Sequence, residues 1–169
     1  MSDYDRTTRE CSLSQLRPEL LKAMQNYFLE HRLGSLEAET LMCCETTSTK
    51  KSTNKLISWL SGNSDATIYT GMLLTSDWLI WVHHGDQSGT QLNAANLKLL
   101  VQAEYATNPI TKEAGLEIAG FIEAAKGGIR GQIGLGSDLA AQKFCEAVKQ
   151  AVARAKPPAP KRQRRWFGI

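Results

Sequence analysis

The sequence predicts an α+β fold that is mainly β, in which a bent antiparallel sheet is closed by a C-terminal helix. Two apolar runs on either side of residues 75–77 have the composition of a β-hairpin. Between residues 139 and 155, apolar side chains recur instead at helical spacing. The chain has 169 residues, of which 42% are hydrophobic and 22% charged, values typical of a single soluble domain with short extensions.

The N-terminal part should contain a disordered segment and then a helix. Residues 1–11 are polar and carry charges of both signs, so we expect them to be disordered. A helix is expected over residues 12–34, because Ser12 and Gln15 fit a capping box. Pro18 is tolerated in its first turn.

One face of this helix is apolar and has to be buried. It could pack on the rest of the domain, or it could mediate homo-oligomerisation by packing against another chain. The stripe consists of Leu16, Leu20, Met24, Tyr27 and Phe28.

The region after residue 35 is expected to form six or seven short antiparallel strands. Residues 36–49 are rich in Thr, Cys and Leu and contain neither Gly nor Pro, which is typical of a long strand. Residues 67–84 form the clearest hairpin, with turn chemistry at residues 75–77. The later strands are expected at residues 90–92, 97–105, 115–124 and 129–135, with a short interruption at residues 93–96.

A second amphipathic helix should close the domain. Ser137 or Asp138 can cap a helix over residues 139–155. Its apolar stripe would seal the open end of the sheet and cover edges that otherwise invite aggregation. The predicted domain therefore spans residues 35–156, followed by a Pro-rich spacer and a basic aromatic tail at residues 157–169.

The hairpin segment also carries a family resemblance. Residues 69–82 read YTGMLLTSDWLIWV, and Gly134-Leu135-Gly136 leads into the terminal helix. These motifs resemble the pleckstrin-homology-like (PH-like) superfamily, especially its small bacterial GRAM-like members, over residues 36–156. The resemblance implies a PH-like bent antiparallel barrel of seven strands capped by a C-terminal helix, to which this chain adds an N-terminal helix. It also implies a binding role rather than catalysis.

Positive charge is concentrated near the C-terminus. Five of the 20 Lys and Arg residues, but none of the 17 acidic residues, follow residue 155. Near an anionic membrane each cation gains about 1 kcal/mol, and Trp favours the headgroup boundary. The tail therefore predicts binding to an anionic membrane surface or to an acidic protein partner, with a merely solubilising tail as the alternative and nucleic acid as the least favoured partner. The residues concerned are Lys161, Arg162, Arg164, Arg165, Trp166 and Phe167.

A second basic group, Lys50, Lys51 and Lys55, follows the predicted first strand. In lipid-binding members of the superfamily the matching loop holds a phosphorylated headgroup, so the resemblance implies a membrane- or partner-binding site here; a polar turn without a ligand is the alternative. Together these features predict a non-catalytic adaptor in the cytoplasm, peripheral at the cytoplasmic face of a membrane. The alternative function is that of a structural or assembly factor whose C-terminal tail inserts into a protein complex.

No sequence pattern indicates an enzyme or a cofactor. There is no GxSxG elbow, and no cysteine or serine lies in a recognisable catalytic motif. A metal site at His83, His84 and Asp86 is disfavoured, because adjacent residues of a strand point to opposite faces. The glycines at residues 134–136 could in principle hold an anion before the terminal helix. The four cysteines, none in a CxxC pair, are expected to be reduced and mostly buried: Cys11, Cys43, Cys44 and Cys145.

Overall fold

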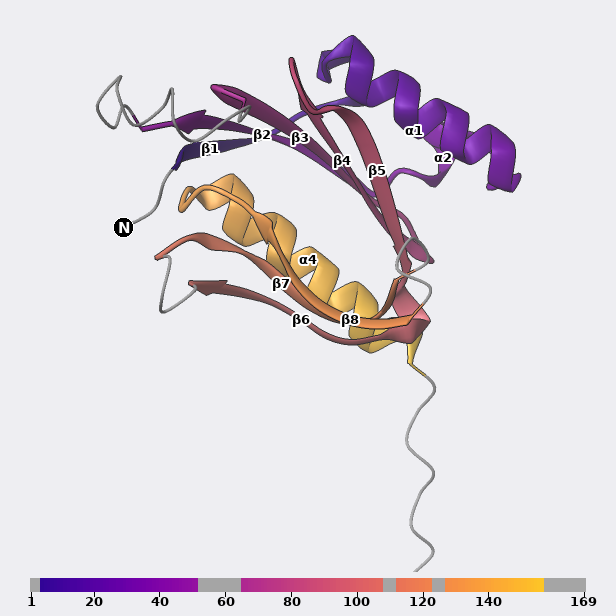
Figure 1. The fold of residues 1–169 in the computed structure, drawn as a ribbon. Coiled ribbons are helices and arrows are strands. Elements are labelled where there is room, and N and C mark those ends of the chain that lie inside the picture. Colours follow the sequence, from indigo (N-terminus) through magenta and orange to yellow (C-terminus); the bar gives the residue numbers. More distant parts are fainter. Residues whose placement is uncertain (1–3, 52–64, 108–111, 123–126, 157–169) are drawn as a thin grey trace, which may run out of the picture.

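Two antiparallel sheets pack on a C-terminal helix that lies between them, and a second long helix covers the outside of the larger sheet (Figure 1). The computed structural model describes residues 4–51, 65–107, 112–122 and 127–156. The strands are β1 (Tyr4–Glu10), β2 (Met42–Lys50), β3 (Thr67–Leu74), β4 (Trp78–Gly85), β5 (Gly89–Asn96), β6 (Leu100–Thr107), β7 (Ala114–Ile122) and β8 (Gly127–Gly134). The helices are η1 (Leu13–Gln15), α1 (Pro18–His31), α2 (Leu36–Glu39), η2 (Leu97–Leu99) and α4 (Leu139–Ala155).

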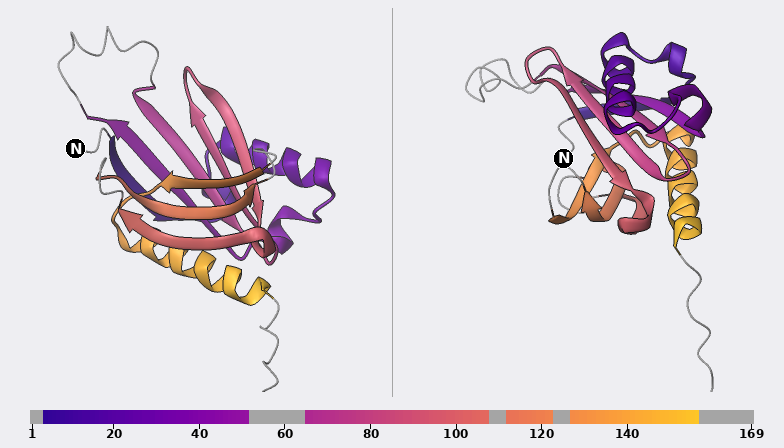
Figure 2. Two further views of the ribbon diagram at one scale, coloured as in Figure 1. Left: turned by 60° about the horizontal axis from the view of Figure 1, so that its bottom comes forward. Right: turned by 90° about the vertical axis from the view of Figure 1, so that its right-hand side faces the viewer.

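The larger sheet has the strand order β1-β2-β3-β4-β5, and the smaller one has the order β6-β7-β8. All neighbouring strands are antiparallel. Figure 2 shows the two sheets crossing at the side where β5 leads through η2 into β6. The prediction of a mainly β fold with a C-terminal helix is confirmed. Within the described residues, however, no strand pairing joins the sheets into a closed barrel.

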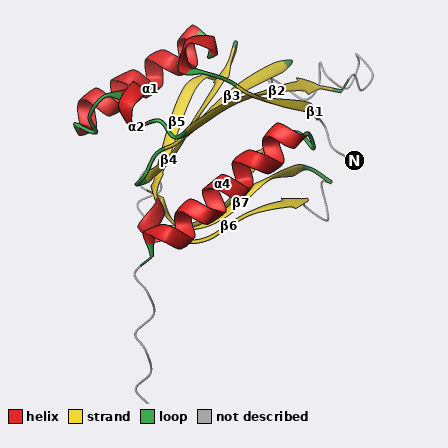
Figure 3. Ribbon diagram, turned by 180° about the vertical axis from the view of Figure 1, so that it is seen from behind, coloured by secondary structure: helices red, strands yellow, loops and turns green. Residues whose placement is uncertain are grey.

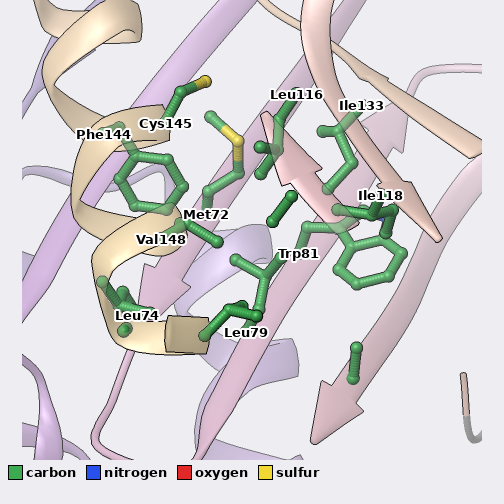
Figure 4. Packing of buried hydrophobic residues seen from close by; sticks show 14 of the residues in the cluster. Met72, Leu74, Leu79, Trp81, Leu116, Ile118, Ile133, Phe144, Cys145 and Val148 are labelled. Atoms are coloured by element: carbon green, nitrogen blue, oxygen red, sulfur yellow. The ribbon is translucent and has the colours of Figure 1, made fainter. Parts of the chain in front are cut away.

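The larger sheet is apolar on both faces, and alternate residues of β3 and β4 belong to different cores. Met72 and Trp81, which are paired in register, contribute to the inner core with α4 and the smaller sheet (Figure 4). Leu73 and Ile80, also paired, contribute to the outer core beneath α1. Figure 3 shows α1 and α4 on opposite faces of this sheet. Burial of both faces explains why the hairpin has two continuous apolar runs instead of an alternating pattern.

The terminal helix α4 begins and ends where the sequence predicts it. Asp138 is its N-cap, and the carboxylate accepts a hydrogen bond from the Ala141 N–H at 2.9 Å. Phe144 and Val148 are fully buried in the inner core (Figure 4). The helix packs on β6, β1 and β2, so it contacts both sheets.

Residues 4–10, expected to be disordered, form the edge strand β1. The strand pairs with β2 over all seven residues, starting with Tyr4 opposite Lys50. Thr8 alone among the seven is buried. Charged side chains on an edge strand discourage pairing with other molecules, and they also leave no apolar alternation by which the strand could be predicted.

Thr8 joins β1 to the beginning of α4. Its hydroxyl lies 2.8 Å from the Thr46 hydroxyl and accepts a hydrogen bond from the Gly136 N–H at 2.9 Å. Its own N–H donates to the Asp138 carboxylate at 2.7 Å. Because buried polar groups are costly unless they are paired, these hydrogen bonds specify where the edge strand meets the helix.

The single N-terminal helix expected over residues 12–34 is divided in two. In η1, the Ser12 N–H donates to Oε1 of Gln15 at 2.9 Å, as the capping box predicts. Arg17 is extended, because the residue before a proline disfavours helical dihedral angles, and α1 therefore begins at Pro18. Arg32, with a φ of 53°, ends α1 in the left-handed conformation.

Two strand boundaries also differ from the prediction. Ser35 caps the helical turn α2 where a strand was expected from residue 36, and the strand itself begins at Met42. Residues 93–96, expected to interrupt the sheet, are part of β5. Ala94 and Ala95 are both buried there, one in each core, so two small residues continue a strand that is covered on both faces.

The inner core predicts a large effect of truncating α4. Phe144→Ala should reduce the free energy of unfolding by about 3–5 kcal/mol, because it removes a fully buried ring and leaves a cavity. Glu146→Ala, on the exposed face of the same helix, is the control and should change it by less than about 0.5 kcal/mol. Urea denaturation followed by circular dichroism measures both. Equal effects of the two variants would contradict the packing of α4 between the sheets.

Candidate functional site

An open groove of about 440 Å³ lies where the C-terminal end of α4 meets the β3–β4 turn and η2. The end of α4 lines one side of the groove with Ala151, Arg154 and Ala155. The complete lining is Leu41, Ser76, Asp77, Lys98, Ala151, Arg154 and Ala155. The helix α4 ends at Ala155 beside this groove (Figure 1).

Three aliphatic side chains are exposed around this end of the molecule. Leu41 is 62% exposed, Leu99 51% and Val101 71%. Leu41 lines the groove, and Leu99 follows Lys98, which lines it as well. Val101 is tied to the end of α4, because its carbonyl accepts a hydrogen bond from Nζ of Lys156 at 3.3 Å. Single exposed aliphatic residues are common on protein surfaces, but three at one end make this end a candidate interaction site.

Cations accompany these aliphatic side chains. Lys98 forms an exposed ion pair with Asp77 at 3.5 Å. Arg154, in the last turn of α4, lines the groove, and Lys156 follows the helix. We refer to Leu41, Lys98, Leu99, Val101, Arg154 and Lys156 as the helix-end surface. It combines exposed apolar area with three positive charges, of which Lys98 is paired with the neighbouring acid Asp77.

The basic loop predicted as a binding site lies at the other end of β2. Lys50 is the last residue of that strand. Lys51 is partly exposed and forms an ion pair with Asp5 at 3.1 Å. Met42, at the start of β2, follows Leu41, which lines the groove. Since a strand rises about 3.3 Å per residue, Lys50 at the end of β2 lies roughly 26 Å from Met42. The structure therefore does not bring these two lysines to the helix-end surface.

The other predicted binding residues lie outside the described part of the chain. They are Lys55, Lys161, Arg162, Arg164, Arg165, Trp166 and Phe167.

The apolar stripe of the N-terminal helix is buried within the chain itself. Leu20, Met24 and Phe28 pack against the outer face of the larger sheet. This is the first of the two arrangements considered for the stripe. Homo-oligomerisation through the N-terminal helix stays a prediction, although the stripe proposed for it is covered by the sheet; Leu29 of the same helix is 80% exposed.

The two histidines of β4 have separate partners. Nδ1 of His83 lies 2.9 Å from the Thr70 hydroxyl, and Nδ1 of His84 lies 2.8 Å from the Thr90 hydroxyl. Among the residues that the structure describes, no three His, Cys, Asp or Glu side chains come together in a way that could hold a metal ion. The geometry gives no support to a metal site with Asp86.

At the glycine segment before α4, groups of the protein itself take the place that an anion would need. The Gly136 N–H donates to the Thr8 hydroxyl, and Asp138 already places a carboxylate at the start of the helix. A Cβ atom at position 136 would meet that carboxylate and the Arg6 carbonyl. This leaves no space for an external anion at Gly136.

Sequence reasoning missed most of the helix-end surface. Residues 97–105 were expected to continue the sheet as one strand. In the structure, η2 and a shift of register between Leu100 and Gln102 precede the regular part of β6, and Val101 is turned outward. Because a one-residue change of register reverses the faces of a strand, the sequence pattern alone could not detect this exposure.

Comparisons with protein-family models, with curated proteins and with solved structures found no match to this chain. None of the helices in the described ranges is long and apolar enough to span a bilayer.

The environment of His83 predicts a dependence of stability on pH. Burial lowers the pKa of His83 below its usual 6.5, because the charged imidazolium loses hydration. Below about pH 6.5 the imidazole of His83 is therefore protonated more in the unfolded chain than in the folded one. The free energy of unfolding consequently decreases as the pH is lowered through this range. Urea titrations from neutral to mildly acidic pH should show this decline, and His83→Gln should reduce it. A proton NMR midpoint for His83 at or above 6.5 would contradict the expectation.

Proposed function

We propose that this protein is a non-catalytic binding module with a PH-like fold that docks on an anionic surface, a membrane or an acidic protein. The order of elements supports the fold. Strands β2–β5 and β6–β8 supply seven antiparallel strands before the terminal helix, and β1 and α1 are additions to that plan. In this proposal the two sheets correspond to the two halves of a PH-like bent barrel.

The helix-end surface is the observation that carries the proposed docking role. It places exposed Leu41, Leu99 and Val101 beside Lys98, Arg154 and Lys156. The residues next along the chain belong to the segment that includes the basic aromatic tail. Apolar side chains that enter a headgroup layer and cations that attract anionic lipid are the two contributions to peripheral membrane binding.

The magnitudes are sufficient for peripheral binding to a membrane. Each cation near an anionic leaflet contributes about 1 kcal/mol, and full burial of a Leu or Val side chain contributes about 1.5–3 kcal/mol. Two or three of each, together with the tail, would give reversible binding that weakens as salt is added. Lys50, Lys51 and Lys55 would provide a separate contact, since Lys50 ends β2 at the end far from the groove and the other two follow it in sequence.

Co-sedimentation with vesicles tests the proposal. The full-length protein should bind phosphatidylcholine vesicles that contain phosphatidylserine and should bind pure phosphatidylcholine weakly. Deleting residues 159–169 removes four cations and an aromatic pair, so it should weaken binding to anionic vesicles at least about tenfold. Higher salt should reduce the binding of the full-length protein.

Surface variants separate the helix-end surface from general charge effects. Leu99→Ser/Val101→Ser should weaken vesicle binding about tenfold, because it removes two exposed aliphatic side chains. Leu29→Ser, which changes an even more exposed aliphatic residue on α1, is the control and should bind like the wild type. Equal binding of all these proteins to anionic vesicles would remove the tail and the helix-end surface from the docking role, and a full-length protein that binds anionic vesicles no better than pure phosphatidylcholine would refute the membrane proposal. Failure to bind vesicles, with salt-resistant capture of one defined protein by a tail peptide, would favour the assembly-factor alternative.

A further inference from the structure

Two cysteine thiols face each other at the end of the β1–β2 ladder. Glu10 is paired with Cys44, so the next residue, Cys11, stands opposite Cys43. The Cys11 N–H donates to the Cys43 carbonyl at 3.1 Å, and the two Sγ atoms are 3.9 Å apart. The other two cysteines, Cys44 and Cys145, are buried in the inner core on the opposite side of the larger sheet.

The backbone already has a separation that suits a disulfide. Directly opposed residues of antiparallel strands have Cβ atoms about 4.5–5.5 Å apart, close to the roughly 3.5–4.5 Å found across disulfides. The two sulfur atoms need to approach by about 2 Å to reach bonding distance. Cys11 is only partly buried, so rotation of its side chain can supply this movement, whereas Cys43 is packed in the outer core.

The surroundings assign different chemical roles to the two thiols. A hydrogen bond from Cys43 and the nearby Arg9 guanidinium lower the pKa of Cys11, against the opposing effects of burial, Glu45 and Glu10. The hydrogen bond to Cys11 and burial raise the pKa of Cys43. Cys11 is therefore the more readily ionised and more accessible thiol, and thiolates are the reactive form. Burial raises the pKa of Cys145 to about 12, so this thiol is rarely ionised at neutral pH and reacts less readily than Cys11.

We propose that Cys11 and Cys43 form a reversible intramolecular disulfide when the protein meets a hydroperoxide. The Cys11 thiolate attacks the peroxide, so that an S–O bond forms, the O–O bond breaks and hydroxide or alkoxide leaves. The Cys43 sulfur then attacks the sulfur of the Cys11 sulfenic acid, so that the S–S bond forms and the S–O bond breaks. The Cys43 proton and the departing hydroxide leave as water. The two sulfurs together lose two electrons, the peroxide gains them, and a dithiol reductant reverses the change.

The disulfide would cross-link the two ends of the segment that carries α1. It joins the residue after β1 to β2 and closes a loop that contains η1, α1 and α2. Such a link restricts the unfolded chain and therefore stabilises the folded one. Oxidation should consequently raise the thermal unfolding midpoint and should leave the protein monomeric on a non-reducing gel.

Peptide mapping of the full-length protein tests this modification. The protein is treated with hydrogen peroxide, alkylated, digested with trypsin and measured by mass spectrometry. Residues 10–22 should be linked to residues 33–50 with the loss of two hydrogen atoms, and dithiothreitol should release them. The first peptide extends past Arg17 because Pro18 follows it.

Variants assign the linkage, because Cys43 and Cys44 lie on the same tryptic peptide. Cys44→Ala/Cys145→Ala should still form the link and still gain thermal stability on oxidation. Cys11→Ser, at the partly exposed position, should form no link and show no gain. Linkage that is lost in Cys44→Ala/Cys145→Ala while its near-ultraviolet circular dichroism stays native would overturn the proposal. So would a disulfide-linked dimer, or a wild-type protein in which Cys11 is oxidised to sulfinic acid with Cys43 still reduced.

Discussion

The larger sheet must be covered on both faces, and this requirement organises the rest of the molecule. Its central hairpin places Met72 and Trp81 on one face and Leu73 and Ile80 on the other, and all four side chains are buried. One helix cannot cover both faces. The inner face is therefore covered by α4 and the smaller sheet, and the outer face by α1 (Figure 3). The N-terminal helix is thus an integral part of the domain, which explains why its apolar stripe is not available to other chains.

Polar contacts then fix how the added N-terminal segment is attached. Thr8 reaches the start of α4, as described above, while Glu45 holds the connection between β1 and α1. Glu45 is almost fully buried and lies 3.2 Å from the Arg9 guanidinium, and it also accepts a hydrogen bond from the Arg17 N–H at 3.0 Å. The Arg17 guanidinium in turn stacks 3.4 Å from the ring of Tyr69. A buried carboxylate needs such partners, so this cluster specifies the position of α1 on the sheet.

The two candidate sites lie in different parts of this framework. The helix-end surface is formed by segments distant in sequence, which meet where α4 ends beside η2 and the β3–β4 turn. The cysteine pair needs only the register of two neighbouring strands. The cysteine pair depends on the pairing of the edge strand β1 with β2, and the helix-end surface depends on the packing of α4 on the larger sheet. The docking proposal and the disulfide proposal are nevertheless independent, since they share no residue.

The hairpin, the terminal helix and the concentration of positive charge after residue 155 could all be predicted from the sequence, because they depend on local periodicity and composition. Features that depend on contacts between distant segments could not be predicted in this way. The polar residues 4–10 became a strand only because β2 offers them an edge, and residues 93–96 stayed in the sheet because small side chains fit between two cores. The exposure of Leu99 and Val101 and the opposition of Cys11 and Cys43 were likewise set by turn geometry and strand register. Neither this exposure nor this pairing of cysteines can be predicted from sequence patterns, because register depends on which strands pair and not on the composition of either strand.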